Sequence, residues 1–526
     1  MTFIISACPS ETSGRSRRRL LHPLPLIGLF VACFVFHIWQ GARVEPQATM
    51  DAAYYHILTD RLIEGHGFTE PFTWHCLHKY KTLEHPIDYW LPLGSTIFAA
   101  SRLAVHSIAS PPPFDPEITL NRLLWALLSA AVFIAAVNRD LKPRFALLAW
   151  AIVAFGGRFA FFVSTSDNVA FYAWFGFILF EALNSPTPLP VVTGVITGLM
   201  CLTRAEGPLF ALFAAYRFMR GSRRRAAVVT LTATLLIISP WFLRNYTALG
   251  TIWPSQTKAF FLREYNDMFE PDSPTKLAEF TATGLVPIIR IRGQALIKGF
   301  TEMFLMPVHL LFFPFWTAGL IAYMIRKKSA PSVGLPAEIT GSLPFFQAFF
   351  CITLSVLLPV QSMNGTFMHV AAAFFPHAAL LAAAGLAESD CSASSLARLF
   401  TRPSLFILYI AWCAIFSVIG ITTTDSFSRL DFQPYTDLEL TRHLSRNDIV
   451  ASPDPVRVNL LTQCQGVCLP RSYASNTGRV IEFARSYNCS AILFDNRHAP
   501  IPEDILSRPD LHELASTAHL LLLSLN

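Results

Sequence analysis

The chain has 526 residues, of which 53% are hydrophobic and only 14% are charged. Because a soluble globular protein carries about 25% charged residues, this composition excludes an ordinary soluble domain. The formal net charge of +6 does not indicate binding to nucleic acid, since the basic residues stand in clusters between apolar runs. These runs recur at lengths of about 20 residues, enough to cross a bilayer core about 30 Å thick. We therefore expect a multi-pass α-helical membrane protein, because open sheet edges cannot be satisfied in lipid.

The first apolar run, from about residue 24 to residue 39, follows four arginines: Arg15, Arg17, Arg18 and Arg19. A basic start before an apolar segment resembles a signal peptide, but no small-residue cleavage site follows. We therefore predict an uncleaved first span. Basic residues gather on the cytoplasmic side of membrane proteins, which places segment 1–22 in the cytoplasm and the first loop, 41–121, outside it.

The segment 90–108 allows two interpretations, because it is apolar but interrupted by proline and charged residues. If it spans the membrane, the basic clusters at 139–144 and 217–225 fall outside, against the positive-inside rule. If it lies along the outer interface as an amphipathic helix, both clusters fall inside, together with 326–328. We predict the interfacial helix.

The later apolar runs predict ten further spans, which makes about eleven in all within a membrane module at 23–424, and we find no internal repeat. They lie near residues 122–138, 144–163, 168–184, 189–203, 206–219, 226–243, 303–325, 343–361, 367–387 and 403–421.

From about residue 425 the sequence becomes polar and predicts a small α/β domain at 425–526. The β-like runs are 448–452, 466–470, 490–495 and 519–525, and a helix over 476–488 has Asn476 or Thr477 as its N-cap. An odd number of spans places this domain outside the cytoplasm. Its cysteines, Cys464, Cys468 and Cys489, permit a disulfide but do not require one, and the ten cysteines of the chain show no zinc-ligand spacing.

Polar residues collect in the predicted outer loops, beginning with the stretch MDAAYY. Asp51 suits either the N-cap of the following helix or a general base that takes a proton from an acceptor hydroxyl. Tyr54 and Tyr55 suit the membrane interface whatever the function. His85 and Asp88, in HPIDYWLPL, belong either to an interfacial turn or to a substrate-binding site.

Two further groups of polar residues follow on the same predicted side. Asp167, in STSDN, is either a helix cap or an active-site carboxylate. Arg204 and Glu206, in LTRAEG, form either a salt-bridged turn or part of a phosphate site. Arg244 and Asn245 end a span, where an arginine either reaches the lipid headgroups or binds a substrate phosphate.

Taken in order, these motifs resemble the GT-C superfamily of polyprenyl-phosphate-sugar-dependent glycosyltransferases, particularly its aminoarabinose transferase and protein O-mannosyltransferase-like branch (family 39-like). The resemblance covers most of residues 24–526. It implies a GT-C-like helical module with an extracytoplasmic α/β domain. It also implies that Asp51 and Asp167 are catalytic, and that Arg244, then Arg204, holds the lipid-linked phosphate. The chain departs from the family where "DA" replaces the usual Asp-Glu and HPIDYWLPL replaces "PPL".

The implied reaction moves a sugar, with inversion, from a polyprenyl-phosphate donor to a lipid, glycan or protein acceptor at the outer face of the inner (plasma) membrane. No cofactor is expected to be required and no metal site is predicted, although the sequence leaves a carboxylate-bound divalent ion open. Tyr54, Tyr55, His85, Asp88, Glu206 and Asn245 are the expected substrate-binding residues beside the arginines. The rival interpretations are a multi-pass transporter, which would place ionisable residues in mid-membrane, and a non-catalytic scaffold.

Overall fold

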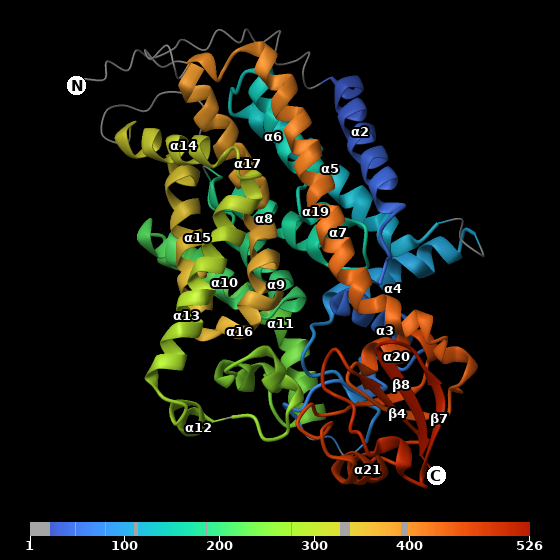
Figure 1. The fold of residues 1–526 in the computed structure, drawn as a ribbon. Helices are drawn as coiled ribbons and strands as arrows, with labels where there is room; N and C mark the ends of the chain where they lie inside the picture. Colours follow the sequence, from blue (N-terminus) through green and yellow to red (C-terminus); the bar gives the residue numbers. More distant parts are fainter. Residues whose placement is uncertain are drawn as a thin grey trace. The chain divides into compact units, whose positions relative to one another are not determined.

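The computed structural model describes residues 22–47, 49–78, 80, 82–109, 114–185, 187–274, 276–326, 337–390 and 398–525 (Figure 1). The arginines of the predicted cytoplasmic N-terminus and most of the basic cluster at 326–328 lie outside these residues. The chain forms two compact units. The helical unit comprises Met1–Val44, Pro112–Ser239 and Arg292–Thr424, and the mixed unit comprises Glu45–Pro111, Pro240–Ile291 and Asp425–Asn526.

The helices of the helical unit follow the predicted spans closely. They are α2 (Pro23–Gly41), α5 (Pro116–Asn138), α6 (Pro143–Phe155), α7 (Phe159–Val163), α8 (Val169–Leu183), α9 (Pro190–Thr203), α10 (Gly207–Arg220), α11 (Arg224–Leu249), α13 (Leu285–Phe300), α14 (Phe313–Arg326), α15 (Ala337–Leu357), α16 (Pro359–Gln361), α17 (Phe367–Asp390) and α19 (Pro403–Asp437), of which α11, α13 and α19 continue into the mixed unit.

Local sequence sets where these helices begin. Proline occupies the first turn of α2, α5, α6 and α9, where its missing N–H costs no hydrogen bond. The carboxylate of Asp115 caps α5 by accepting hydrogen bonds from the backbone N–H groups of Glu117 and Ile118. The α17 helix is buried from Phe367 to Leu386 and packs against α8, α14 and α6, so it forms the centre of the unit.

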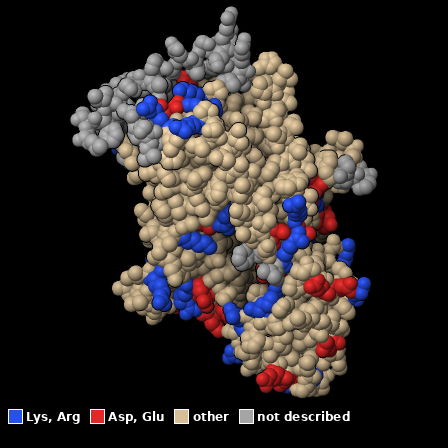
Figure 2. Space-filling model, turned by 45° about the horizontal axis from the view of Figure 1, so that its top comes forward, with Lys and Arg blue, Asp and Glu red and all other residues tan. Residues whose placement is uncertain are grey.

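The predicted multi-pass helical fold is confirmed. Within the part of the chain that the structure describes, five helical segments are long and apolar enough to cross a membrane: α2, α5, α11, Pro359–Asp390 and Pro403–Ser426. Four shorter apolar helices lie among the described residues, so the expected total of eleven spans stays a prediction. The face in Figure 2 carries a broad surface without Lys, Arg, Asp or Glu over the helices, as lipid contact requires.

Three predicted spans are interrupted, one of them 343–361, which Leu358 divides into α15 and α16. The run 144–163 divides into α6 and α7, because Gly156 and Gly157 adopt φ values of 73° and 52°, outside the helical region. The run 303–325 begins with a π-helical turn, Thr301–Leu305, and a 3₁₀ turn, Met306–Val308, and becomes α-helical only at α14.

The mixed unit is built on a six-stranded sheet. Its strands, in spatial order, are β2 (Phe72–Thr73), β5 (Gln465–Cys468), β4 (Ile449–Ser452), β6 (Ala491–Asp495), β8 (Leu520–Leu525) and β7 (Leu511–Ser516). The first four are parallel, and β8 is antiparallel to both β6 and β7. The predicted strands and the α/β fold of the tail are thus confirmed. The contribution of β2 from the first loop was not predicted.

Apolar side chains cover both faces of this sheet. Val467, Ile492 and Phe494 belong to one buried cluster, whereas Val450 and Leu493 belong to another, as the alternation of side chains along a strand requires. The helices of the tail are α20 (Pro455–Thr462) and α21 (Thr477–Ser486). Of the two predicted caps for α21 the structure selects Asn476, whose side chain accepts from the Arg479 N–H. Cys464, Cys468 and Cys489 are free thiols.

The remaining elements of the mixed unit come from its three segments of chain. The segment 45–111 holds α3 (Met50–Ile63), α4 (Leu93–His106) and the antiparallel pair β1 (Thr69–Glu70) and β3 (His85–Pro86). The segment 240–291 holds η1 (Ser255–Phe261), η2 (Tyr265–Phe269) and α12 (Leu277–Thr281), and the tail holds η6 (Leu440–Arg442) and η7 (Ile505–Ser507). The segment predicted as an amphipathic helix is α4, which buries Phe98 and exposes Leu103.

Candidate functional site

Asp167 occupies the short connection between α7 and α8 and is fully buried in the helical unit. Buried amides hold this connection. The Asn121 Nδ2 donates to the backbone carbonyls of Thr165 and Asp167, each at 2.8 Å, and the Asn168 Nδ2 donates to the Thr203 carbonyl at 3.3 Å. Asn168 occupies the N-cap position of α8, so Asp167 stands one residue before the cap. The Asp167 carboxylate lies in the interior.

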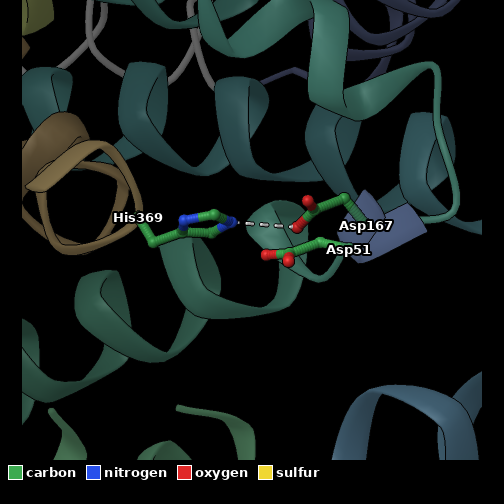
Figure 3. Close-up of side chains that lie close together, drawn as sticks. All are labelled: Asp51, Asp167 and His369. Atoms are coloured by element: carbon green, nitrogen blue, oxygen red, sulfur yellow. Dashed lines mark hydrogen bonds and ion pairs between the residues drawn. The ribbon is translucent and has the colours of Figure 1, made fainter. Parts of the chain in front are cut away.

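His369, in the first turn of α17, points toward Asp167 (Figure 3). Its Nδ1 lies 3.0 Å from the Gly365 carbonyl and its Nε2 lies 3.3 Å from Asp167 Oδ1. A carbonyl only accepts, so Nδ1 carries the proton, and in a neutral ring Nε2 then presents a lone pair to the carboxylate. Two acceptors face each other unless the ring takes a second proton or a cation lies between them.

Arg204 and Glu206 lie in the same unit, between α9 and α10. The Arg204 Nε donates to Glu206 Oε1 at 3.0 Å, and Glu206 is buried. Burial acts to raise the pKa of Asp167, but the charges of His369 and, further, Arg204 outweigh it, so the pKa of Asp167 lies below its usual value. The helical unit therefore brings together three of the predicted residues, Asp167, Arg204 and Glu206.

Asp51 lies in the first turn of α3, in the mixed unit, and is half-buried. The predicted N-cap role is wrong, because Thr49 precedes it and its Oγ1 accepts the Ala52 N–H at 3.2 Å. Asp51 still gains from the helix N-terminus, where the dipole favours a negative charge. Tyr55, one turn on, is buried in α3, so it does not lie on a solvent-exposed face.

Tyr54 belongs to a buried polar network inside the first loop. Its hydroxyl donates to the carboxylate of Glu70, and its ring stacks on Trp90 with centroids 3.8 Å apart. Burial, then the charge of Asp88, raises the pKa of Glu70 well above its usual value. His85 lies 3.5 Å from Glu70, and burial lowers the pKa of His85 to about 4. The network therefore favours a protonated Glu70 and a neutral His85.

Asp88 continues this network and is buried as well. It accepts from His75 Nε2 at 3.1 Å and from the Ser255 hydroxyl of η1. Burial acts to raise the pKa of Asp88, but His75 and Ser255 hold the pKa below its usual value. Asp88 thus ties the first loop to residues 240–291 through buried hydrogen bonds.

Arg244 holds the first loop through its backbone. Its Nη1 donates to the Ile87 carbonyl at 2.7 Å and its Nη2 to the Phe68 carbonyl at 2.5 Å, and its guanidinium lies over Trp241. Nη1 also reaches the Asn245 Oδ1 at 2.9 Å. Asn245 in turn donates to the Ile252 carbonyl. These contacts stabilise the loop that carries His85 and Asp88.

Sequence reasoning missed His369, Glu70, His75 and Ser255. His369 carries the clearest signal, since an ionisable residue inside a long apolar run is costly unless it has a partner or a function. A histidine that donates one ring N–H to a carbonyl is also a common metal ligand. Asp167 and His369 therefore fit part of a divalent-cation site that water or a substrate phosphate would complete. Asp167 Oδ2 is buried with no hydrogen bond among the described residues.

No family model matches the chain, and no curated protein matches it in sequence. Solved structures do match. A crystal structure of the oligosaccharyltransferase of Archaeoglobus fulgidus, tethered to an acceptor peptide, covers 91% of this chain and 70% of its own, with a TM-score of 0.55 and 14% identity. A crystal structure of ArnT from Cupriavidus metallidurans, bound to undecaprenyl phosphate, covers 95% of this chain and 98% of its own, with a TM-score of 0.58 and 11% identity.

The chain has the GT-C fold. Both matches extend over the helices and into the α/β tail, as their coverage of this chain requires. The expected architecture is therefore confirmed, although identities this low speak for the fold alone. A further structure of the Archaeoglobus fulgidus protein, in complex with Zn and sulfate, covers 89% of this chain and 68% of its own, with a TM-score of 0.52 and 15% identity.

Proposed function

We propose that this protein is a membrane glycosyltransferase that moves a sugar from a polyprenyl-phosphate donor to a lipid, glycan or protein acceptor. The observation that carries the proposal is the fold match over nearly the whole length of ArnT, in a structure that holds undecaprenyl phosphate. The match with an oligosaccharyltransferase bound to an acceptor peptide supports the same class of reaction. These matches do not identify the acceptor of this chain, because a shared fold does not carry over the acceptor of another protein.

The proposed reaction is a single displacement with inversion. The acceptor hydroxyl attacks the anomeric carbon, the bond from that carbon to the phosphate oxygen breaks, and the phosphate leaves with its polyprenyl chain. We assign Asp51 as the base that takes the hydroxyl proton. Its half-buried position in the first turn of α3 leaves it accessible to an acceptor. Asp167 is the second catalytic carboxylate, and its lowered pKa keeps it charged near neutral pH.

We assign Arg204 before Arg244 as the side chain that stabilises charge on the leaving phosphate. The guanidinium of Arg244 already donates to two backbone carbonyls of the first loop. Arg204 is bound to one carboxylate, Glu206, and its charge acts on Asp167. Tyr54, His85 and Asp88 then serve the substrate indirectly, since their buried contacts shape the loop.

The displacement balances without a cofactor. A divalent cation held by Asp167 and His369 would add positive charge beside the phosphate. The chain's own contribution in either case is to fix the backbone that carries Asp167 through the buried amides of its connection.

The experiment that tests the function measures consumption of a radiolabelled polyprenyl-phosphate-sugar pool by membranes that contain the chain. Wild type should release sugar from the lipid, and Asp51→Asn and Asp167→Asn should each reduce the rate by at least about 100-fold, as expected for loss of a general base. Glu64→Gln, at the exposed C-terminal end of α3, is the matched control and should retain the wild-type rate. Wild-type activity in both Asp variants would refute the assignment.

We propose a plasma-membrane location with the N-terminus in the cytoplasm and the tail outside it. The connection after α5, at Asp140, then faces the cytoplasm. In a chain without other reactive cysteines, Asp140→Cys should be labelled by an impermeant thiol reagent only after the cytoplasmic face is opened. Labelling of intact cells would reverse the orientation.

A transporter is the second candidate, because one ionisable contact lies among apolar helices. The His377 Nε2 of α17 lies 3.0 Å from Glu181 of α8, which also binds Arg139 at 2.6 Å. Glu181 and Arg139 stand near the C-terminal ends of α8 and α5, so their ion pair holds these two helix ends together. A transporter would consume no donor, so the same assay separates the two candidates.

A further inference from the structure

A cavity of about 210 Å³ lies wholly within the mixed unit. Its lining includes the residues that follow three parallel strands. Asp454 follows β4, Arg471 follows β5, and Asp495 ends β6 with His498 after it. The cavity therefore lies at the carboxyl edge of the parallel part of the sheet.

The connectivity of the sheet explains why a cavity forms at this edge. β4 is the central strand, β5 pairs with one side of it and β6 with the other. The connections that leave β4 and β5 thus lead to opposite sides of β4. In open α/β sheets such a change of direction leaves a crevice outside the strand ends, and ligands bind there.

The acidic groups around the cavity are held in place by buried partners. Arg457, only 4% exposed, donates to Asp431 Oδ2 at 2.8 Å, and its Nε lies 3.3 Å from Asp454 Oδ2. The Asp495 carboxylate accepts from Arg497 Nε at 2.8 Å and lies 3.6 Å from His498. The carboxylates are therefore preorganised, which reduces the entropy lost when they bind a ligand.

The chemistry of the lining selects against an anion. The lining contains three carboxylates, Asp431, Asp454 and Asp495, against two guanidinium groups, Arg457 and Arg471, so it carries no excess of positive charge. Carboxylates accept from hydroxyl groups and guanidinium groups donate to them. A ligand rich in hydroxyl groups satisfies both kinds of group at once.

Aromatic side chains supply the apolar part of the same cavity. Tyr265 and Phe269 of η2 and Phe494 of β6 all line it. An aromatic face beside a few fixed polar groups suits a ring whose edges carry hydroxyl groups and whose faces carry C–H groups. We infer that this cavity is a saccharide-binding site.

The cavity also adjoins the first turn of α3. Met50 lines it, and α20 packs against α3. Tyr265 is 38% exposed, and burial, followed by the charge of Asp51, raises the pKa of Tyr265 above its usual value. If the proposed transferase function holds, on which this statement alone rests, the bound saccharide is part of a glycan acceptor presented near Asp51.

The test measures binding of methyl α-D-mannopyranoside and N-acetylglucosamine to the full chain in lipid nanodiscs by saturation-transfer NMR. Wild type should bind at least one of them saturably. Ala499→Trp, which fills the cavity, and Arg471→Ala, which removes an exposed lining group, should each weaken binding at least tenfold. Arg479→Ala, another exposed arginine of the same domain outside the cavity, should bind as wild type does.

Three results would overturn the inference. The first is that neither sugar binds wild type, and the second is that both sugars bind Ala499→Trp as tightly as they bind wild type. The third is that inorganic phosphate binds wild type and loses the same affinity in Arg471→Ala, which would make the cavity an anion site. Glycoside binding by wild type is measured without a lipid-linked donor, so a failed transfer reaction and a failed saccharide site give different results.

Discussion

The Nε2 of His369 lies 3.3 Å from the Oδ1 of Asp167, while the Nδ1 of the same ring faces the Gly365 carbonyl at 3.0 Å. The backbone carbonyl accepts the Nδ1 proton, so a neutral ring would direct the lone pair of Nε2 at an anion. A proton or a metal ion between the two groups removes the repulsion. This pair links the connection before α8 to the start of α17, two elements far apart in the sequence.

Zn²⁺ binding is expected to depend on this pair. His369→Gln and Asp167→Asn should each weaken the binding of Zn²⁺ to the chelator-treated protein by about 10–100-fold, the usual effect of losing a group in or next to a metal shell. Equilibrium dialysis measures this directly. His377→Gln is the matched control, because His377 lies two turns further along α17 and contacts Glu181 instead. Equal binding by His369→Gln and wild type would contradict the prediction.

Arg244 is expected to stabilise the first loop. Arg244→Ala removes hydrogen bonds to the Phe68 and Ile87 carbonyls, worth about 3 kcal/mol together. Amide hydrogen exchange in β1 and β3 should therefore become faster, and Arg244→Lys should rescue it only in part, because an ammonium cannot reproduce the planar fork. Arg263→Ala, whose guanidinium binds Asp267, is the control. If exchange is unchanged and binding of the lipid-linked donor is weaker, Arg244 binds the donor phosphate and does not stabilise the loop.

His85 should lower the stability of the first loop on mild acidification, whereas Glu70, whose raised pKa keeps its proton bound in the folded chain, acts in the opposite direction. The pKa of His85 is about 4 in the folded chain, because burial disfavours its charged form, and about 6.5 when unfolded. Between these values the unfolded state binds more protons, so stability present above pH 6.5 is lost as the pH falls toward 4, by about 3 kcal/mol.

Hydrogen exchange in β1 and β3 between pH 7 and pH 4.5, corrected for intrinsic rates, measures this loss. Relative to wild type, His85→Gln should become more protected as the pH falls over this window, whereas His512→Gln, on the exposed part of β7, should behave as wild type does. Asp88 adds little here, because its lowered pKa makes its contribution disappear only at more acidic pH. A pH dependence unchanged by His85→Gln would contradict the assignment.

Gly176 is expected to be required for the packing of α8 on α17. A Cβ at this position would collide with the backbone of Ala373, which cannot move as a side chain can. Gly176→Ala should therefore destabilise the helical unit by about 1–3 kcal/mol, the usual cost of overpacking. Thermal unfolding in detergent measures the effect. Gly28→Ala, whose Cβ would meet no atom within 4 Å, should leave the midpoint unchanged.

Much of the architecture was predictable because apolar length and proline position determine it locally. α5, α9 and α19 begin within a few residues of the predicted spans, and Pro116, Pro190 and Pro403 stand at those starts. The break between α6 and α7 was not predicted, since the two glycines there are compatible with a helix on composition alone. The π-helical turn at Thr301–Leu305 carries no local sequence signal either, whereas the turn at Ser362–Thr366 falls between two predicted spans and contains the pair Asn364 and Gly365.

The site was less predictable, because its partners are remote in sequence. Asp167 and Arg204 could be named from their polar loops, but His369 lies about 200 residues beyond Asp167 in an apolar helix. The capping role of Asp51 was wrong because Thr49, two residues earlier, takes it. Asp454 and Asp495 were not singled out, since only the pairing of β4 with β5 and β6 brings their strand ends together.

The strand β2 has a consequence for how the protein is made. Phe72 pairs with Gly466, so the sheet needs a piece of chain that emerged from the ribosome about 400 residues before its partner. At ordinary rates of synthesis the early piece waits for tens of seconds. During that time its backbone edge has no native neighbour, and such edges attract other chains. During biogenesis there is thus an interval in which a chaperone could protect the unpaired edge of β2. In a prematurely terminated chain this edge would stay unpaired.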